Sequence, residues 1–100
     1  MAYEAGALEA TLQAAAGGDA ALFAELRDAF AESVTRQVDL LERSRCDGNW
    51  TLAAMRLKGL AASFHAKALL DLAEEALEAA PGEPTVIRRL KGYVADVSAN

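Results

Sequence analysis

The stretch that decides the fold is Trp50 to His65, which reads W-T-L-A-A-M-R-L-K-G-L-A-A-S-F-H. At the turn of about 100° per residue of an α-helix, this stretch separates into two unlike faces. One face carries the large apolar side chains and has the width of an ordinary core stripe. Its members are Trp50, Ala53, Ala54, Leu57, Leu60, Ala61 and Phe64. The pattern therefore predicts a helix that is buried along this side.

The opposite face is small, smooth and nearly uncharged, whereas the outer face of a helix normally carries charged residues. Its members are Thr51, Leu52, Met55, Gly59, Ala62 and Ser63, with Arg56 and Lys58 at the margins. Gly59 lies in mid-helix, where glycine costs about 1 kcal/mol relative to alanine. One interpretation is that another protein packs closely on this face. The other is that Gly59 makes room for a neighbouring segment of the same chain, and periodicity alone does not decide between them.

Length and composition favour a single all-α domain. The 100 residues are 53% hydrophobic but only 6% aromatic, and alanine, the strongest helix former, supplies much of the apolar content. A chain of this length supports one modest core, so we expect one domain over residues 1–100. The formal net charge of −5 argues against binding to nucleic acid or to an anionic membrane, because both attract basic patches.

A short first helix and four amphipathic helices are expected along the chain. They cover residues 2–16, 20–45, 50–65, 66–79 and 84–98. Asp19 is the expected N-cap of the second helix, after the glycines at 17 and 18 have ended the first. Residues 47–49 (Asp-Gly-Asn) are expected to form a turn before the third helix. Short connections between helices are typical of an up-and-down four-helix bundle, here with a short additional N-terminal helix that covers one end.

The sequence offers little sign of catalytic chemistry. It has no phosphate-binding loop, dinucleotide fingerprint or nucleophile elbow, so we expect neither an enzyme nor a cofactor. One cysteine, Cys46, and one histidine, His65, make a Cys/His zinc site implausible, and no metal is expected. We interpret Cys46 as a small apolar residue near a helix end. Neither a secretory signal nor an apolar run near the roughly 20 residues that cross a bilayer is present, which favours a cytoplasmic protein.

The segment that carries the smooth face contains basic residues and no acidic ones. No acidic residue occurs from Gly48 to Leu70, while Arg56, Lys58 and Lys67 lie within that segment. We therefore expect a locally positive face on an acidic protein, which would attract and orient an acidic partner. Three cations in a segment of this length could also arise by chance, and the charge pattern gains weight only because it coincides with the smooth face.

The segment from Ala53 to Ala66 resembles the signature of the histidine-containing phosphotransfer (HPt) family, H-x-L-K-G followed by small residues and a Gly-Ala turn. Leu57, Lys58 and Gly59 match the L-K-G, and small residues follow. Where the family has its phosphoryl-accepting histidine this chain has Met55, and where the family has the turn glycine it has His65. Together with the length, the helix order and the Gly-Gly-Asp break at residues 17–19, the resemblance covers nearly the whole chain.

The resemblance implies a module of a bacterial-type two-component phosphorelay. In that family an exposed histidine shuttles a phosphoryl group between the aspartates of receiver domains. It implies that Met55 occupies a degenerate phosphoacceptor position, that Lys58 lies beside the phosphoryl group and that Gly59 leaves room for the receiver's loops. The surrounding contact residues would be Thr51, Arg56, Ala62 and Ser63. A thioether is no comparable phosphoryl carrier, so the resemblance implies a monomer that docks a response-regulator receiver domain or a histidine kinase without carrying phosphate.

Two alternatives stay open at this point. His65 could serve as the phosphoacceptor, although its position near a helix end also suits a residue that interacts favourably with the helix dipole. Otherwise the chain is a structural or oligomerising helical bundle in which the motif is a relic. The sequence does not distinguish a natural loss of the histidine at Met55 from a single change in an active parent.

Overall fold

The computed structural model describes the backbone of residues 2–99 and the side chains of residues 6–98, and every regular element in this part of the chain is an α-helix. The helices are α1 (Ala2–Ala16), α2 (Ala20–Arg43), α3 (Asp47–Phe64), α4 (Lys67–Glu78) and α5 (Pro84–Ala99). The all-α prediction is confirmed. The bounds agree with the expected helices to within about one helical turn.

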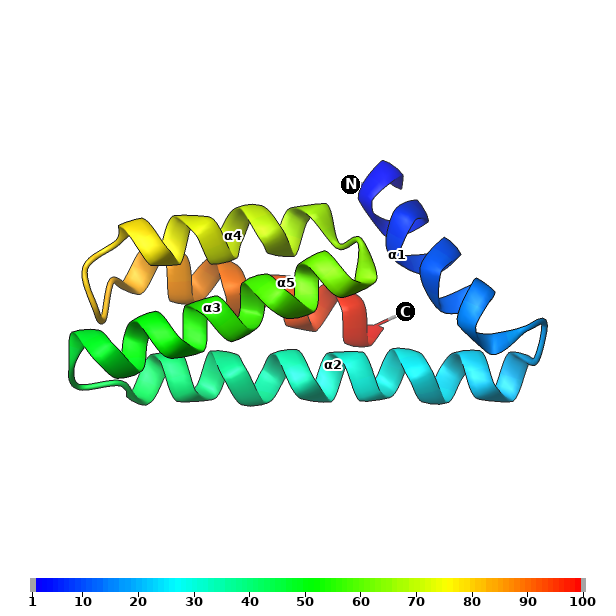
Figure 1. Ribbon diagram of the computed structural model, residues 1–100, viewed down its shortest axis with the longest axis horizontal. Helices are drawn as coiled ribbons and strands as arrows, with labels where there is room; N and C mark the ends of the chain where they lie inside the picture. Colours follow the sequence, from blue (N-terminus) through cyan, green and yellow to red (C-terminus); the bar gives the residue numbers. More distant parts are fainter. Residues whose placement is uncertain (1, 100) are drawn as a thin grey trace.

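The longest helix, α2, runs along one long side of the molecule (Figure 1). It contacts α3 and α5, while α4 contacts both α3 and α5, so these four helices surround a shared interior. The first helix, α1, diverges from the long axis at one end of the molecule and contacts α2, α3 and α4. The molecule is elongated, with principal extents of 43 × 21 × 21 Å.

All five helices contribute to one cluster of buried apolar side chains. The largest of these that are fully buried are Trp50, Phe30, Leu12, Leu41, Leu57, Leu69, Leu90, Val34 and Val86. The rings of Phe30 on α2 and Phe64 on α3 lie 4.9 Å apart between centroids with a tilt of 57°, a favourable arrangement for an aromatic pair. The predicted stripe of α3 faces this cluster, although Leu60 and Phe64 are only partly buried. Leu72 on α4 and Ile87 on α5 are also buried.

The break between α1 and α2 forms as the sequence predicts. Gly17 and Gly18 have φ angles of 61° and 89°, in the left-handed region that glycine adopts without steric cost. Asp19 then caps α2, because its Oδ1 accepts hydrogen bonds from the backbone N–H groups of Ala21 at 3.0 Å and Leu22 at 3.1 Å. Two otherwise unpaired donors of the first turn are satisfied in this way.

The expected turn at residues 47–49 is wrong, because these residues form the first turn of α3. The helical ladder already includes Trp50, whose N–H donates to the carbonyl of Cys46 at 3.1 Å. The carboxylate of Asp47 lies in that first turn, where the positive end of the helix dipole stabilises it. Cys46 occupies the N-cap position of α3, near a helix end as expected, and it is exposed.

The outer face of α2 is charged and exposed. Its members are Glu25, Asp28, Glu32, Arg36, Asp39, Glu42 and Arg43. The Arg43 Nη2 atom lies 3.1 Å from Asp39 Oδ2. Such i,i+4 pairs contribute only about 0.3–0.5 kcal/mol each at a solvent-exposed surface. Among the described residues, no helix combines the length and the apolar character that crossing a membrane requires.

Trp50 fixes α3 against α4. Its side chain is 2% exposed, and its Nε1–H donates to the carbonyl of Ala76 at 2.7 Å. Ala76 lies in the last turn of α4, and its carbonyl also accepts from the N–H of the C-cap residue Ala79 at 3.2 Å. The indole therefore fills a core position and adds a second, buried donor to an acceptor at the end of the neighbouring helix.

We predict that Trp50→Phe lowers the free energy of unfolding by about 1–3 kcal/mol, because the Ala76 carbonyl loses a buried donor and the smaller ring leaves space in the core. Urea denaturation followed by far-UV circular dichroism measures the change. An unfolding midpoint equal to that of the parent protein would contradict the role assigned to the indole N–H.

Candidate docking surface on α3

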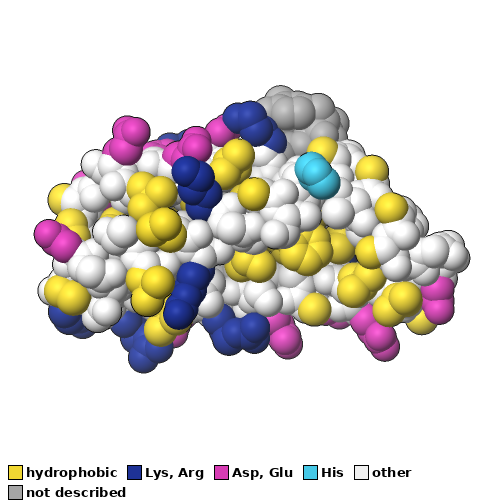
Figure 2. All heavy atoms as spheres, viewed as in Figure 1, with side chains coloured by type: hydrophobic (Ala, Val, Ile, Leu, Met, Phe, Trp, Pro, Cys, Tyr) yellow, Lys and Arg dark blue, Asp and Glu magenta, His cyan; other side chains and the backbone are white. Residues whose placement is uncertain are grey.

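The residues of the smooth face all lie at the surface of the folded protein. We call them the α3 face: Thr51, Leu52, Met55, Arg56, Lys58, Gly59, Ala62 and Ser63, every one of which is exposed. Figure 2 views the molecule from the side on which α3 lies in front, and there hydrophobic and uncharged side chains are interspersed with a few basic ones. Acidic side chains lie mainly toward the edges of this view.

The centre of the α3 face is apolar. Met55 is 57% exposed and Leu52 is 49% exposed, and these are the two most exposed large hydrophobic side chains in the described part of the chain. They are three positions apart in the sequence, so they are neighbours on the helix surface. Removing apolar surface from water stabilises a complex by about 25 cal/mol per Å² before the costs of association. The flexible thioether of methionine suits a surface that adapts to a partner.

No neighbour among the described residues explains Gly59. A Cβ atom placed on Gly59 meets no atom within 4 Å. The interpretation that Gly59 makes room for another segment of the same chain is therefore wrong. The glycine leaves a bare patch of helix backbone one turn beyond Met55, where a second molecule could approach closely.

The expected positive charge of this region is partly compensated. The Lys58 Nζ atom lies 3.7 Å from the Glu74 Oε2 atom of α4, with the two side chains 47% and 51% exposed. Lys67 pairs in the same way with Asp71, at 2.6 Å between Nζ and Oδ1. In the described part of the chain no ion pair involves Arg56. The α3 face is thus less positive than the acid-free segment predicts, because α4 supplies the carboxylates.

His65 ends α3 in a left-handed conformation, with φ 59° and ψ 37°. Its N–H donates to the carbonyl of Ala62 at 3.4 Å, and the N–H of Ala66 donates to the carbonyl of Ala61 at 2.8 Å. These two bonds make a Schellman motif, in which the left-handed position is usually glycine. The interpretation of His65 as a residue of the C-terminal turn is confirmed. The motif also gives a physical reason for the glycine in the signature that this segment resembles.

The His65 side chain joins this turn to α1. Its Nδ1 lies 2.9 Å from Thr11 Oγ1, and the Thr11 hydroxyl also lies 3.1 Å from the carbonyl of Ala7, to which it donates. The Thr11 hydroxyl has a single proton, so the His65 Nδ1 donates to Thr11 when that proton is directed at Ala7 and accepts when it is directed at the ring. No local pattern in the sequence predicts this contact, because the two partners are 54 positions apart in the chain.

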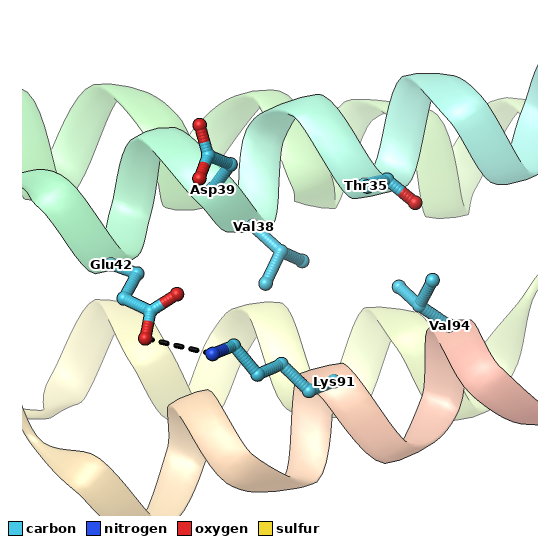
Figure 3. A pocket seen from close by; sticks show the side chains of 6 residues that line it. All are labelled: Thr35, Val38, Asp39, Glu42, Lys91 and Val94. Atoms are coloured by element: carbon cyan, nitrogen blue, oxygen red, sulfur yellow. Dashed lines mark hydrogen bonds and ion pairs between the residues drawn. The ribbon is translucent and has the colours of Figure 1, made fainter.

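A separate open pocket of about 280 Å³ lies between α2 and α5 (Figure 3). Its lining residues are Thr35, Val38, Asp39, Glu42, Lys91 and Val94. The Lys91 Nζ atom on α5 donates to the Glu42 Oε2 atom on α2 at 2.8 Å, so these two charged groups on opposite sides of the pocket are already paired. None of the predicted site residues lines this pocket. Within the described residues, no group of three or more His, Cys, Asp or Glu side chains is arranged to hold a metal ion.

No model of a protein family, no curated protein and no solved structure matches this chain. The HPt resemblance therefore depends on the residues of α3 and on the order of the helices.

We predict that His65→Gly is more stable than His65→Ala by about 1 kcal/mol. Both variants lose the hydrogen bond to Thr11, but only alanine keeps a Cβ in the left-handed position. Thermal and urea denaturation of the two proteins, measured side by side, isolate the backbone strain. Equal stability of the two variants would show that the left-handed conformation at the end of α3 is wrong.

Proposed function

We propose that this protein is an HPt-like module of a two-component phosphorelay, which docks a receiver domain or a histidine kinase through the α3 face and does not itself carry phosphate. The observation that carries the proposal is the exposure of Met55, 57%, at the position of the family's acceptor histidine. Around it lie Lys58 and Gly59 of the L-K-G, both exposed. The packing of the protein's own core does not require a surface of this kind.

The proposed architecture is the up-and-down four-helix bundle of the HPt family, formed by α2 to α5 as a single domain, with α1 as an additional N-terminal helix. The short connections between successive helices and their shared core support it. In this arrangement α3 lies at the outside of the bundle, so its unburied side is open along its length to a partner.

Phosphoryl transfer to a protein needs a nucleophile that forms a reactive phosphorylated intermediate, and imidazole nitrogen supplies one. The Met55 thioether has no proton to lose and would form no comparable phosphoryl carrier. The module therefore acts by binding. It occupies the docking surface of a partner and modulates that partner's access to active phosphotransfer proteins. No enzymatic activity or cofactor is part of the proposal.

The charges of the α3 face suit an acidic, concave partner. Arg56 and Lys58 flank the apolar centre, and basic groups at the rim of an interface mainly raise the association rate and fix the orientation. The active-site pocket of receiver domains is acidic, which matches this arrangement. The net charge of −5 for the whole chain disfavours nucleic acid and anionic membrane as partners. In this proposal the module works as a monomer in the cytoplasm.

His65 is a weaker candidate for a phosphoacceptor. It lies ten residues beyond Met55, a rise of about 15 Å along the helix, so a receiver centred on Met55 would not present its aspartate to His65. Its Nδ1 is also held by Thr11. A purely structural role, in which Met55 and Leu52 are buried between copies of the chain, predicts a stable oligomer that light scattering would detect.

We predict that the natural protein acquires no acid-labile phosphate from phosphorylated receiver domains of its own organism, whereas Met55→His does. The substitution restores the acceptor on an intact docking surface. Labelled acyl phosphate on the receivers makes transfer visible, and His65→Ala combined with Met55→His serves as the control for the second histidine. Labelling of the natural protein would show that another residue accepts phosphate, with His65 the first to test.

We predict that Gly59→Gln weakens receiver binding by about tenfold or more, because a long side chain then stands where the partner approaches. Gly92→Gln on α5 is the matched control, since a Cβ on Gly92 also meets nothing within 4 Å. Both substitutions replace glycine inside a helix by a better helix former and should raise stability slightly. Titration calorimetry of both variants tests the prediction, and equal weakening by the two substitutions would contradict the assigned surface.

A further inference from the structure

The two cations of the α3 face lie on opposite margins of the helix. Measured around the helix from the buried Trp50, Lys58 lies about 80° to one side, and this side borders α4, with which Lys58 forms its ion pair. Phe64 and Arg56 lie about 40° and 120° to the other side. That side borders α2, because the ring of Phe64 packs on the ring of Phe30. We call the two sides the α4 margin and the α2 margin.

The positive charge of the α4 margin is cancelled by carboxylates. The exposed charged residues on one side of α4 are Lys67, Asp71, Glu74 and Glu78. With Lys58 included, three carboxylates stand against two ammonium groups on this margin. The Glu74 Oε2 atom lies 3.7 Å from the Lys58 Nζ atom. An acidic group of a partner that approached Lys58 would therefore also approach Glu74 and be repelled by it.

The cation of the α2 margin is not compensated in this way. Arg56 is exposed, and it joins no ion pair among the described residues. A guanidinium group stays charged at physiological pH, and its fork of N–H donors can bind a carboxylate through two parallel hydrogen bonds. Of the two cations on the α3 face, Arg56 is therefore the one that is free to bind an acidic partner.

Exposed apolar surface also extends to the α2 margin. After Met55 and Leu52, the next most exposed large hydrophobic side chain in the described part of the chain is Leu40, at 39%. Leu40 lies in the last turn of α2, which the short connection at residues 44–46 places beside the beginning of α3. It lies about 80° around α2 from Phe30, the residue that packs on α3. In Figure 2, hydrophobic and basic side chains gather at the lower left, where α3 lies beside the end of α2, and several acidic ones lie along the upper left, over α4.

We propose, on the basis of the docking function above, that the receiver domain docks off-centre on the α3 face, over its α2 margin. Arg56 binds a carboxylate at the acidic pocket of the receiver, and the burial of Leu40, Leu52 and Met55 favours the complex. Lys58 contributes little, because Glu74 accompanies it. This placement differs from the one that the resemblance implies, in which the lysine of the L-K-G lies nearest to the reacting groups.

The first test compares Arg56→Gln with Lys58→Gln, using the purified receiver domains of the source organism that bind the natural protein. Both substitutions remove one positive charge from an exposed position of the same helix, so their difference reports position and not net charge. Surface plasmon resonance at low salt is expected to show a dissociation constant about tenfold higher for Arg56→Gln, with slower association. Lys58→Gln is expected to change the constant by less than about twofold.

Two further comparisons test the reasons for this difference. Glu74→Gln frees Lys58, so adding Lys58→Gln to Glu74→Gln should weaken binding by several-fold although Lys58→Gln alone does not. Leu40→Gln should also weaken binding by several-fold. Leu22→Gln is its matched control, because Leu22 is 36% exposed near the other end of α2.

The outcomes separate the off-centre placement from the docking function. A loss of affinity in Lys58→Gln that equals or exceeds the loss in Arg56→Gln would overturn the placement and leave the docking function intact. Equal effects of Leu40→Gln and Leu22→Gln would also overturn it. The absence of binding of the natural protein to every receiver domain would overturn both the placement and the proposed function.

Discussion

The rotation of α3 about its own axis is the constraint on which the rest of this structure depends. The buried Trp50 indole, with its N–H donated to the Ala76 carbonyl at 2.7 Å, fixes that rotation near the beginning of the helix. At about 100° per residue, Met55 and Gly59 then lie about 140° and 180° from Trp50. The contact that holds α3 to α4 therefore also determines that the smooth face is directed to solvent.

Features that depend on the spacing of neighbouring residues could be predicted from the sequence. The two faces of α3 and the Asp19 cap follow from helical geometry and from the chemistry of one or two side chains. Contacts between helices could not be predicted in this way. Lys58 meets Glu74, and His65 meets Thr11, only because the helices pack in one particular arrangement. Both contacts modify the candidate site, the first through its charge and the second through the turn that ends α3.

The structure at each end of α3 has a local cause. An Asp-Gly-Asn sequence is typical of a turn. The N–H groups in the first turn of a helix have no acceptor within the helix, and an acidic residue near them is favourable. The sequence at residues 47–49 therefore suits both a turn and the first turn of a helix. The helix forms here, because the carbonyl of Cys46 accepts a hydrogen bond from the N–H of Trp50. At the other end, His65 adopts a conformation that favours glycine, because the Schellman motif supplies partners for the last carbonyl groups.

An exposed glycine in mid-helix is not by itself evidence of a binding surface, and this chain provides the comparison. A Cβ on Gly92 of α5 would meet as little as one on Gly59. The neighbours of Gly92 on its helix include the exposed residues Arg88 and Asp96, as expected for a face that meets water. Gly59 instead lies beside the exposed apolar side chain of Met55. An exposed glycine with no apolar neighbours only lowers the stability of its helix. An exposed glycine beside exposed apolar side chains lets a partner approach the helix backbone closely, and the burial of those side chains favours association. That combination occurs on α3, which is why the functional argument concerns α3 and not α5.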